Sequence, residues 1–115
     1  MKKGKKRTST NEAIKRRWAI RIHLEKNYDE TCAALMADRL ESLLDYMQYG
    51  YAVVAHRRQN GEFRLVRATL LPYEHAFRRK YDIARVTGAV VFWDVDRQAW
   101  NSFQVENFLE WKPIN

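Results

Sequence analysis

The chain has 115 residues, of which 46% are hydrophobic, and a formal net charge of +7. This length and apolar content are enough for one domain with a modest core. The single cysteine excludes an intramolecular disulfide, and no apolar run approaches the roughly 20 residues of a membrane span. Because the basic start leads into a charged segment rather than an apolar one, we expect no signal peptide and a cytoplasmic protein.

The positive charge is concentrated at the N-terminal end. Residues 1–26 hold ten Lys and Arg against Glu12 and Glu25, a net of +8, whereas the remaining residues have a net of −1. Basic segments of this kind commonly contact phosphate backbones, although solubility or an acidic protein partner selects similar charge. The candidate phosphate-binding cations here are Lys2, Lys3, Lys5, Lys6, Arg7, Lys15, Arg16, Arg17 and Arg21.

Two parts are predicted within this basic region. Residues 1–8 lack an apolar anchor, so we predict a disordered tail that is either simply solvated or a phosphate-binding arm. Ser9 and Glu12 have capping-box spacing, which predicts a helix from there to about Lys26. Its apolar residues at helical spacing are Ile14, Trp18 and Ile22. We expect this face to pack on the next helix, and a helix lying on a membrane surface is the alternative.

A second, acidic helix should follow. Asp29 is the expected N-cap, and the pattern continues to about Gln48, before Gly50 as a left-handed terminating residue. The expected apolar stripe is Cys32, Ala33, Leu35, Met36, Ala37, Leu40, Leu43, Leu44 and Met47. The opposite face carries Asp38, Glu41 and Asp45. Residues 9–49 are therefore predicted to form a hairpin of one basic and one acidic helix.

Residues 50–115 have the pattern of a small β-rich domain. Strands are predicted at 51–58 and 63–71, joined by an Asn60-Gly61 type I′ turn, because Asn-Gly is a strong hairpin signal. A closing hairpin pairs 90–95 with 99–105 around a turn at 94–98, and a short strand at 109–112 precedes Pro113. Five short strands are typical of a small barrel.

The connection at 73–87 is the least regular part. It is predicted to be either a long loop or one helical turn around 76–81. Arg78, Arg79 and Lys80 lie there among aromatic side chains, a mixture found in loops that bind single-stranded nucleic acid. The alternative is that Phe77 and Tyr81, at helical spacing, simply anchor the connection to the domain.

Residues Val90 to Phe108 carry a resemblance to a known family. Two apolar residues, an aromatic, Asp, a short turn and then Trp-x-x-Phe-x-Val-Glu-Asn-Phe resemble the end of the WYL-like family with an Sm-like, SH3-like β-barrel. The hairpin at 51–71 is similar to the family's first hairpin. The resemblance covers about residues 50–111, and such short proteins occur largely in Bacteroidales bacteria, their mobile elements and phages. It implies that residues 50–115 form a five-stranded Sm-like barrel associated with nucleic acid or nucleotides. Together with the basic tail and the two-helix hairpin predicted above, this gives an α+β protein.

Residue patterns for catalysis are missing from the sequence. Cys32 lies on the predicted apolar stripe, where a packed thiol is expected. His23, His56 and His75 have no metal-ligand spacing, and the scattered glycines form no phosphate loop. We therefore expect a non-enzyme that needs no cofactor.

The function favoured by the sequence is a non-catalytic nucleic-acid-associated binding module, in which the N-terminal cations and Arg78, Arg79 and Lys80 contact the backbone. The alternative is a structural or protein-interaction component, either a homo-oligomer or a protein that docks on a virion or other partner. Pairing of the first helix's arginines with the acidic face of the second would favour that alternative. A small-molecule sensor, the third class considered, requires an open pocket around Trp93 and Trp100.

Overall fold

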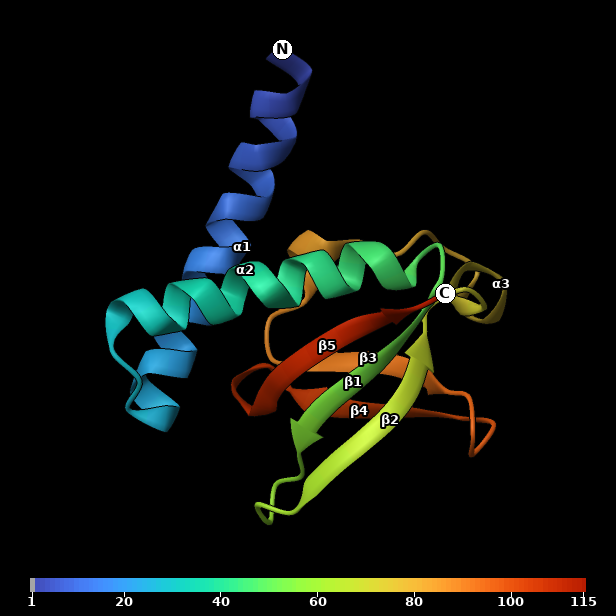
Figure 1. Ribbon diagram of the computed structural model, residues 1–115. Helices are drawn as coiled ribbons and strands as arrows, with labels where there is room; N and C mark the ends of the chain where they lie inside the picture. Colours follow the sequence, from blue (N-terminus) through green and yellow to red (C-terminus); the bar gives the residue numbers. More distant parts are fainter. Residues whose placement is uncertain (1) are drawn as a thin grey trace.

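A computed structural model describes the backbone of residues 2–115 and the side chains of residues 11–115. The chain is α+β, as predicted, with α2 lying across one side of an antiparallel sheet and α1 crossing α2 (Figure 1). The helices are α1 (Lys2–Lys26), α2 (Glu30–Met47) and α3 (Tyr73–Phe77), with short 3₁₀ turns η1 (Ile83–Arg85) and η2 (Val105–Asn107). The strands are β1 (Tyr51–Arg57), β2 (Phe63–Thr69), β3 (Ala89–Asp94), β4 (Ala99–Gln104) and β5 (Phe108–Ile114).

The five strands form an open sheet in the order β4-β3-β2-β1-β5. β1 pairs along its length with both β2 and β5, whereas β2 and β3 are joined only through Ala68↔Asp94 and Thr69↔Trp93. The predicted number of strands is confirmed, but in the part of the chain that the structure describes β4 and β5 are edges, and the sheet does not close into a barrel. β5 also continues through Pro113, because an edge strand tolerates the missing amide donor.

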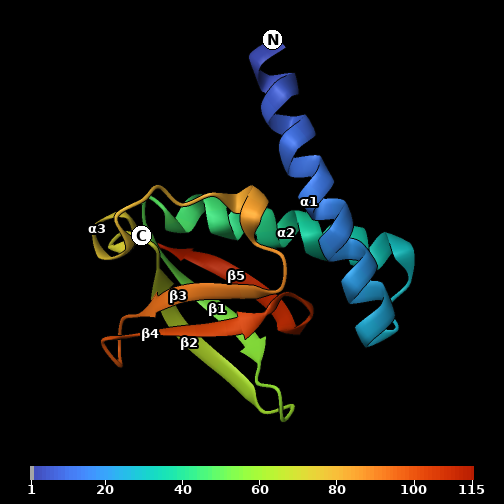
Figure 2. The ribbon, with the colours of Figure 1, turned by 180° about the vertical axis from the view of Figure 1, so that it is seen from behind.

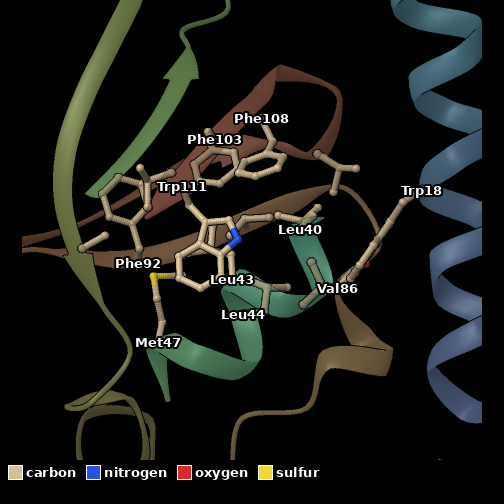
Figure 3. Packing of buried hydrophobic residues seen from close by; sticks show 14 of the residues in the cluster. Trp18, Leu40, Leu43, Leu44, Met47, Val86, Phe92, Phe103, Phe108 and Trp111 are labelled. Atoms are coloured by element: carbon tan, nitrogen blue, oxygen red, sulfur yellow. The ribbon is translucent and has the colours of Figure 1, made fainter. Parts of the chain in front are cut away.

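The core lies between α2, the inner face of the sheet and the C-terminal half of α1. The fully buried residues include Trp18, Ile22, Leu40, Leu43, Leu44, Met47, Val54, Val90, Phe92 and Phe108. The Trp18 ring extends from α1 toward Val86, and its Nε1 donates to the Val86 carbonyl oxygen at 2.5 Å (Figure 3). The predicted stripe on α1 is thus confirmed, and it packs on the 83–86 segment as well as on α2.

The start of α1 differs from the prediction. The helix begins at Lys2, whereas the capping-box pattern placed its start at Ser9 after a disordered tail. Lys and Arg are favourable helix formers and no proline interrupts this segment, so the helix can continue to the N-terminal end. The side chains of residues 1–10, including those of Lys2, Lys3, Lys5, Lys6 and Arg7, lie outside the described part of the structure.

α2 begins as predicted, but its buried stripe is shifted. Asp29 caps the helix, since its Oδ1 accepts from the Cys32 amide at 2.7 Å. Cys32 and Leu35 are exposed, so the expectation of a packed thiol was wrong. The buried residues are Ala33, Ala37, Leu40, Leu43, Leu44 and Met47. α2 packs against both α1 and the sheet, and these two contacts together select the buried face.

Two glycines behave differently from the predictions made for them. Gly61 has φ of +88°, but Asn60 does not share its positive φ, so the type I′ turn was wrong. Arg58 N donates to Glu62 O at 2.8 Å, which closes a three-residue loop ending in Gly61. Gly50 is not left-handed. A Cβ at Gly50 would lie 3.1 Å from the Tyr46 ring, so close packing is the reason for glycine there.

Candidate functional site

The cations of α1 divide into exposed and paired side chains. Arg16 and Arg17 are exposed and form no ion pair with any residue from 11 to 115. Lys15 instead binds three carboxylates, with Nζ 2.8 Å from Glu12, 3.0 Å from Asp38 and 3.4 Å from Glu41. The hydrogen bond that Lys15 donates to Glu12, together with the neighbouring carboxylates of Asp38 and Glu41, raises the pKa of Lys15 above its ordinary value. Lys15 therefore joins α1 to α2 and is not available to a ligand.

Arg21 also has a structural role. Its Nε lies 2.6 Å from Glu106 Oε1, and its Nη2 donates to Gln104 Oε1 at 3.0 Å. A Cβ at Gly88 would come within 2.8 Å of Arg21 Nη1, so glycine leaves room for the guanidinium. Arg21 thus fixes α1 to the end of β4 and to η2. Four of the predicted phosphate-binding cations of α1 have described side chains: Lys15, Arg16, Arg17 and Arg21. Of these four, only Arg16 and Arg17 are exposed and form no ion pair with residues 11–115.

The connection after β2 begins with a short helix that starts earlier than predicted. α3 follows Pro72 directly and ends at Phe77, and the next residue, Arg78, has φ of +56°. The Tyr73 ring packs on Phe77 and Tyr81, with centroids 4.7 Å and 5.0 Å away. The aromatic side chains therefore anchor this connection, as one of the two interpretations predicted. Arg78, Arg79 and Lys80 are all exposed.

A hollow of about 600 Å³ lies beside these cations. Its lining residues are Tyr73, Arg79, Lys80, Tyr81, Asp82, Arg85, Val86, Ala89 and Val91, and we call it the loop cleft. The Tyr81 hydroxyl is buried and has no hydrogen-bond partner within the described residues, and burial raises the pKa of Tyr81. The loop cleft adjoins α1 through Val86, the residue to which Trp18 donates.

Figures 1 and 2 show how the elements that carry these cations are arranged. α3 lies near the C-terminal end of α2, whereas α1 crosses α2 away from that end, so α3 and the basic helix α1 lie apart. η1 packs against α1 and contributes Arg85 to the loop cleft, which places a cation between the two groups. Sequence reasoning missed Arg85, which stands alone in the sequence after Ile83 and Ala84.

A second hollow, of about 460 Å³, lies between the β1–β2 hairpin and β4. Its lining residues are His56, Arg57, Arg58, Gln59, Asn60, Arg64, Val66, Arg97, Asn101, Ser102, Phe103, Gln104 and Asn107, and we call it the hairpin cleft. It contains four arginines and, among the described residues, no carboxylate. The sequence places Arg57, Arg58 and Arg64 together at this hairpin, but sequence reasoning did not identify a cleft there. One signal was present, because strand alternation places Arg64 on the same face as the buried Val66 and Ala68.

Carboxylates near the hairpin cleft only partly neutralise its arginines. Arg58 lies 3.3 Å from Glu62, whereas Arg64 Nε is 3.7 Å from the same carboxylate and has no hydrogen-bond partner. Arg97 lies 3.2 Å from the buried Asp94. Within residues 11–115, the Arg57 side chain donates only to a backbone carbonyl oxygen, that of Gly61 at 3.0 Å.

His56 lies at the inner side of the hairpin cleft and is only 5% exposed. Its ring stacks on Phe103 with centroids 4.8 Å apart, and its Nδ1 is 3.4 Å from the Arg57 carbonyl oxygen. Nε2 is buried and has no partner within the described residues. Burial, assisted by the neighbouring Arg64 and Arg58, lowers the pKa of His56, so the ring is neutral near pH 7.

Other candidate sites are less developed. Trp93 and Trp100 pack edge to face at 5.4 Å, and neither lines one of the two clefts. The residues that the structure describes include no group of three or more His, Cys, Asp or Glu side chains placed to hold a metal ion. A search of the described helices found none that is long and apolar enough to cross a membrane.

The open five-stranded sheet with its flanking helices defines a small binding-type module of Sm-like, SH3-like architecture. The chain belongs to the WYL_2 family, whose model, described as an Sm-like SH3 beta-barrel fold, matches residues 40–109. This match confirms the family resemblance and extends it into α2. Searches of curated proteins and of solved structures found no significant match.

Proposed function

We propose that this protein is a non-catalytic module that associates with nucleic acid, and that it serves as a regulator in a phage or mobile element. The observation that supports this best is the loop cleft, where Arg79, Lys80 and Arg85 surround a hollow partly walled by Tyr73 and Tyr81. Cationic side chains beside aromatic rings suit a phosphate backbone with unstacked bases. The strongly basic N-terminal segment adds neutralising charge.

The position of α1 supports the same proposal. The N-terminal half of α1 projects away from α2 and the sheet, so its backbone lies apart from the rest of the fold (Figures 1 and 2). Arg16 and Arg17 lie on that helix without a carboxylate partner among residues 11–115. Backbone contacts of this kind contribute affinity but no sequence preference.

Fluorescence anisotropy across a salt series tests the proposal. Labelled single-stranded and double-stranded DNA and RNA are titrated with the full chain, with R16Q/R17Q and with K80Q/R85Q. Each double variant should flatten the slope of log K against log salt by up to about 1.4–1.8, because each lost phosphate contact contributes about 0.7 to 0.9. Equal slopes for all proteins would contradict the assignment.

A charge-matched control is available on the opposite side of the sheet. Arg67 and Lys112 flank Val53 on neighbouring strands, and neither residue lines a cleft. The R67Q/K112Q variant therefore removes two positive charges and leaves both clefts unchanged. This variant should retain the original slope. Deleting all of α1 is unsuitable because Trp18 and Ile22 belong to the core, whereas a chain lacking residues 1–10 tests the N-terminal cations separately.

A structural or protein-interaction role is the second candidate. It is favoured by Phe63 and Leu65, which are 53% and 64% exposed on β2, and by the free edge of β4. Exposed apolar side chains beside a free strand edge are features of protein interfaces. Sedimentation velocity of the full chain and of L65Q distinguishes the two candidate functions. A concentration-dependent oligomer that L65Q disrupts supports assembly. A monomer for both proteins excludes the homo-oligomer.

A further inference from the structure

We propose that the hairpin cleft is a binding site for a phosphate monoester. The site uses residues of the β1–β2 hairpin, the β3–β4 turn and β4, none of which takes part in the proposed backbone contacts of α1 and the loop cleft. It therefore stands independently of the proposed nucleic-acid function. A monoester occurs as inorganic phosphate, on a mononucleotide or at the end of a strand, and the experiment below separates these sources.

The cleft follows from the way the sheet is built. β2 and β3 pair over only two residue pairs near the C-terminal end of β2, so the start of β2 separates from the β3–β4 hairpin. Inward positions of β1 and β2 that would otherwise lie against β3 face this opening. They are occupied by His56 and Arg64, which are partners in the β1–β2 register. An inward-facing arginine beside a buried histidine leaves polar groups where the rest of the inner face is apolar.

Charge in the hairpin cleft favours an anion with several oxygen atoms. Arg58 and Arg64 share the single carboxylate of Glu62, and Arg57 has no acidic partner among residues 11–115. The carboxylate near Arg97 is Asp94, whose oxygens already accept the amides of Asp96 and Arg97 at 3.1 Å.

Two positive charges are therefore left in excess within about 460 Å³. Guanidinium groups bind phosphate oxygens through paired N–H donors, and several of them together suit a group that has more than two free oxygen atoms, as a monoester has.

Two buried polar atoms at the hairpin cleft, Arg64 Nε and His56 Nε2, have no hydrogen-bond partner within the described residues. Arg64 Nε lies too far from Glu62, at 3.7 Å, for a hydrogen bond, and a phosphate oxygen would accept one from it. The Arg57 carbonyl oxygen can only accept, so His56 carries its proton on Nδ1 and presents a lone pair at Nε2. A monoester can keep one P–OH, which donates to that lone pair. A backbone diester has no such group, and this difference assigns the site to a monoester.

Titration of the full-length ¹⁵N-labelled protein tests the proposal. The probes are inorganic phosphate, adenosine monophosphate, and one short oligonucleotide with and without a 5′-phosphate. Saturable amide shifts at residues 56–64 and 97–107 are expected with at least one monoester, and an oligonucleotide should cause them only when it carries the 5′-phosphate. The probe that binds most tightly identifies the natural source of the monoester: inorganic phosphate, a mononucleotide or the phosphorylated end of a strand.

Arg64→Gln should weaken the tightest monoester about tenfold or more, because it removes a charged donor from a partly buried site. Arg67→Gln is the matched control, because Arg67 lies three residues after Arg64 on the opposite face of the same strand. The affinity of this variant for the monoester should equal that of the original protein. Arg57→Gln, at an exposed residue, repeats the test if Arg64→Gln does not fold.

Equal affinities for the variants and the control would overturn the proposal. Shifts confined to α1 and the loop cleft, or no saturable shift with any monoester, would also overturn it. Neither result would contradict the nucleic-acid proposal, which rests on different residues.

Discussion

The loop cleft and the hairpin cleft are both basic, but the chain presents their cations in different ways. Arg79 and Lys80 of the loop cleft follow a short helix on a connection between strands, and both are exposed. Two of the four arginines of the hairpin cleft, Arg57 and Arg64, come from paired strands, and Arg64 lies on the inner face of the sheet. Exposed cations on a connection can adapt to a long polyanion, whereas cations fixed by strands suit one ligand of defined shape.

The two clefts also depend on different parts of the fold. The loop cleft includes Val86, whose carbonyl oxygen accepts the Trp18 indole, so α1 helps to hold its wall. The hairpin cleft includes Arg97, which is held by the buried Asp94 and is independent of that contact. Changes at Trp18 and at Asp94 should therefore separate the two clefts experimentally.

Trp18→Ala should have the largest effect. It removes a completely buried indole and its hydrogen bond to Val86, and such a truncation costs about 3–5 kcal/mol in the free energy of unfolding. Urea denaturation measures the loss. In variant protein that remains folded, amide shifts should be larger at residues 79–91 than at residues 56–64. Leu24→Ala, on the same helix at a 72% exposed residue, is the control and should change stability little.

Asp94→Ala should have the next largest effect. The buried carboxylate accepts from the amides of Asp96 and Arg97 and from the Arg97 guanidinium. Leaving these donors unpaired should cost about 1–3 kcal/mol, measured by urea denaturation. Asp94→Asn keeps one acceptor oxygen and should lose less. Equal stability of both variants and the original protein would show that the turn does not depend on these bonds.

These contacts explain why the sequence predicted the loop cations and missed the hairpin cleft. Arg78, Arg79 and Lys80 are consecutive, so a reader of the sequence finds them at once. The arginines at 58, 64 and 97 meet only because the strands bring them together, which requires the strand register and the short β2–β3 pairing. Helix types, strand number and the order of elements followed from apolar periodicity and turn residues.

Residues that pack against two elements were harder to predict. Lys15 and Arg21 belong to the basic face of α1, yet each binds carboxylates elsewhere in the fold, and the sequence pattern alone does not reveal these partners. The displaced stripe of α2 has the same cause, because Cys32 and Leu35 have suitable spacing but face solvent. Tertiary contacts therefore decided which of the predicted cations remain available to a ligand.

The pH dependence of stability should identify His56 as a buried neutral histidine. Its pKa is lower in the folded state than the ordinary value of 6.5, so the unfolded chain binds more protons in the window below that value. The free energy of unfolding should therefore fall as pH decreases through 6.5 toward the folded pKa. His56→Phe should weaken this dependence in urea denaturation, while exposed His75→Gln should retain it. The same pH slope in His56→Phe and the original protein would contradict this account.

Arg67→Gln should have the smallest effect and so complete the comparison of the two clefts. Arg67 pairs with Asp96 at the surface, and this pair lowers the pKa of Asp96. Solvent screens such a pair, so thermal unfolding should show no measurable change. Because Arg67 and Arg64 carry the same charge on opposite faces of β2, a ligand that senses only total charge would respond equally to both substitutions. The affinity of a ligand bound in the hairpin cleft should fall in Arg64→Gln and not in Arg67→Gln. An equal loss of affinity in both variants would indicate binding to a diffuse basic surface and not to a defined site.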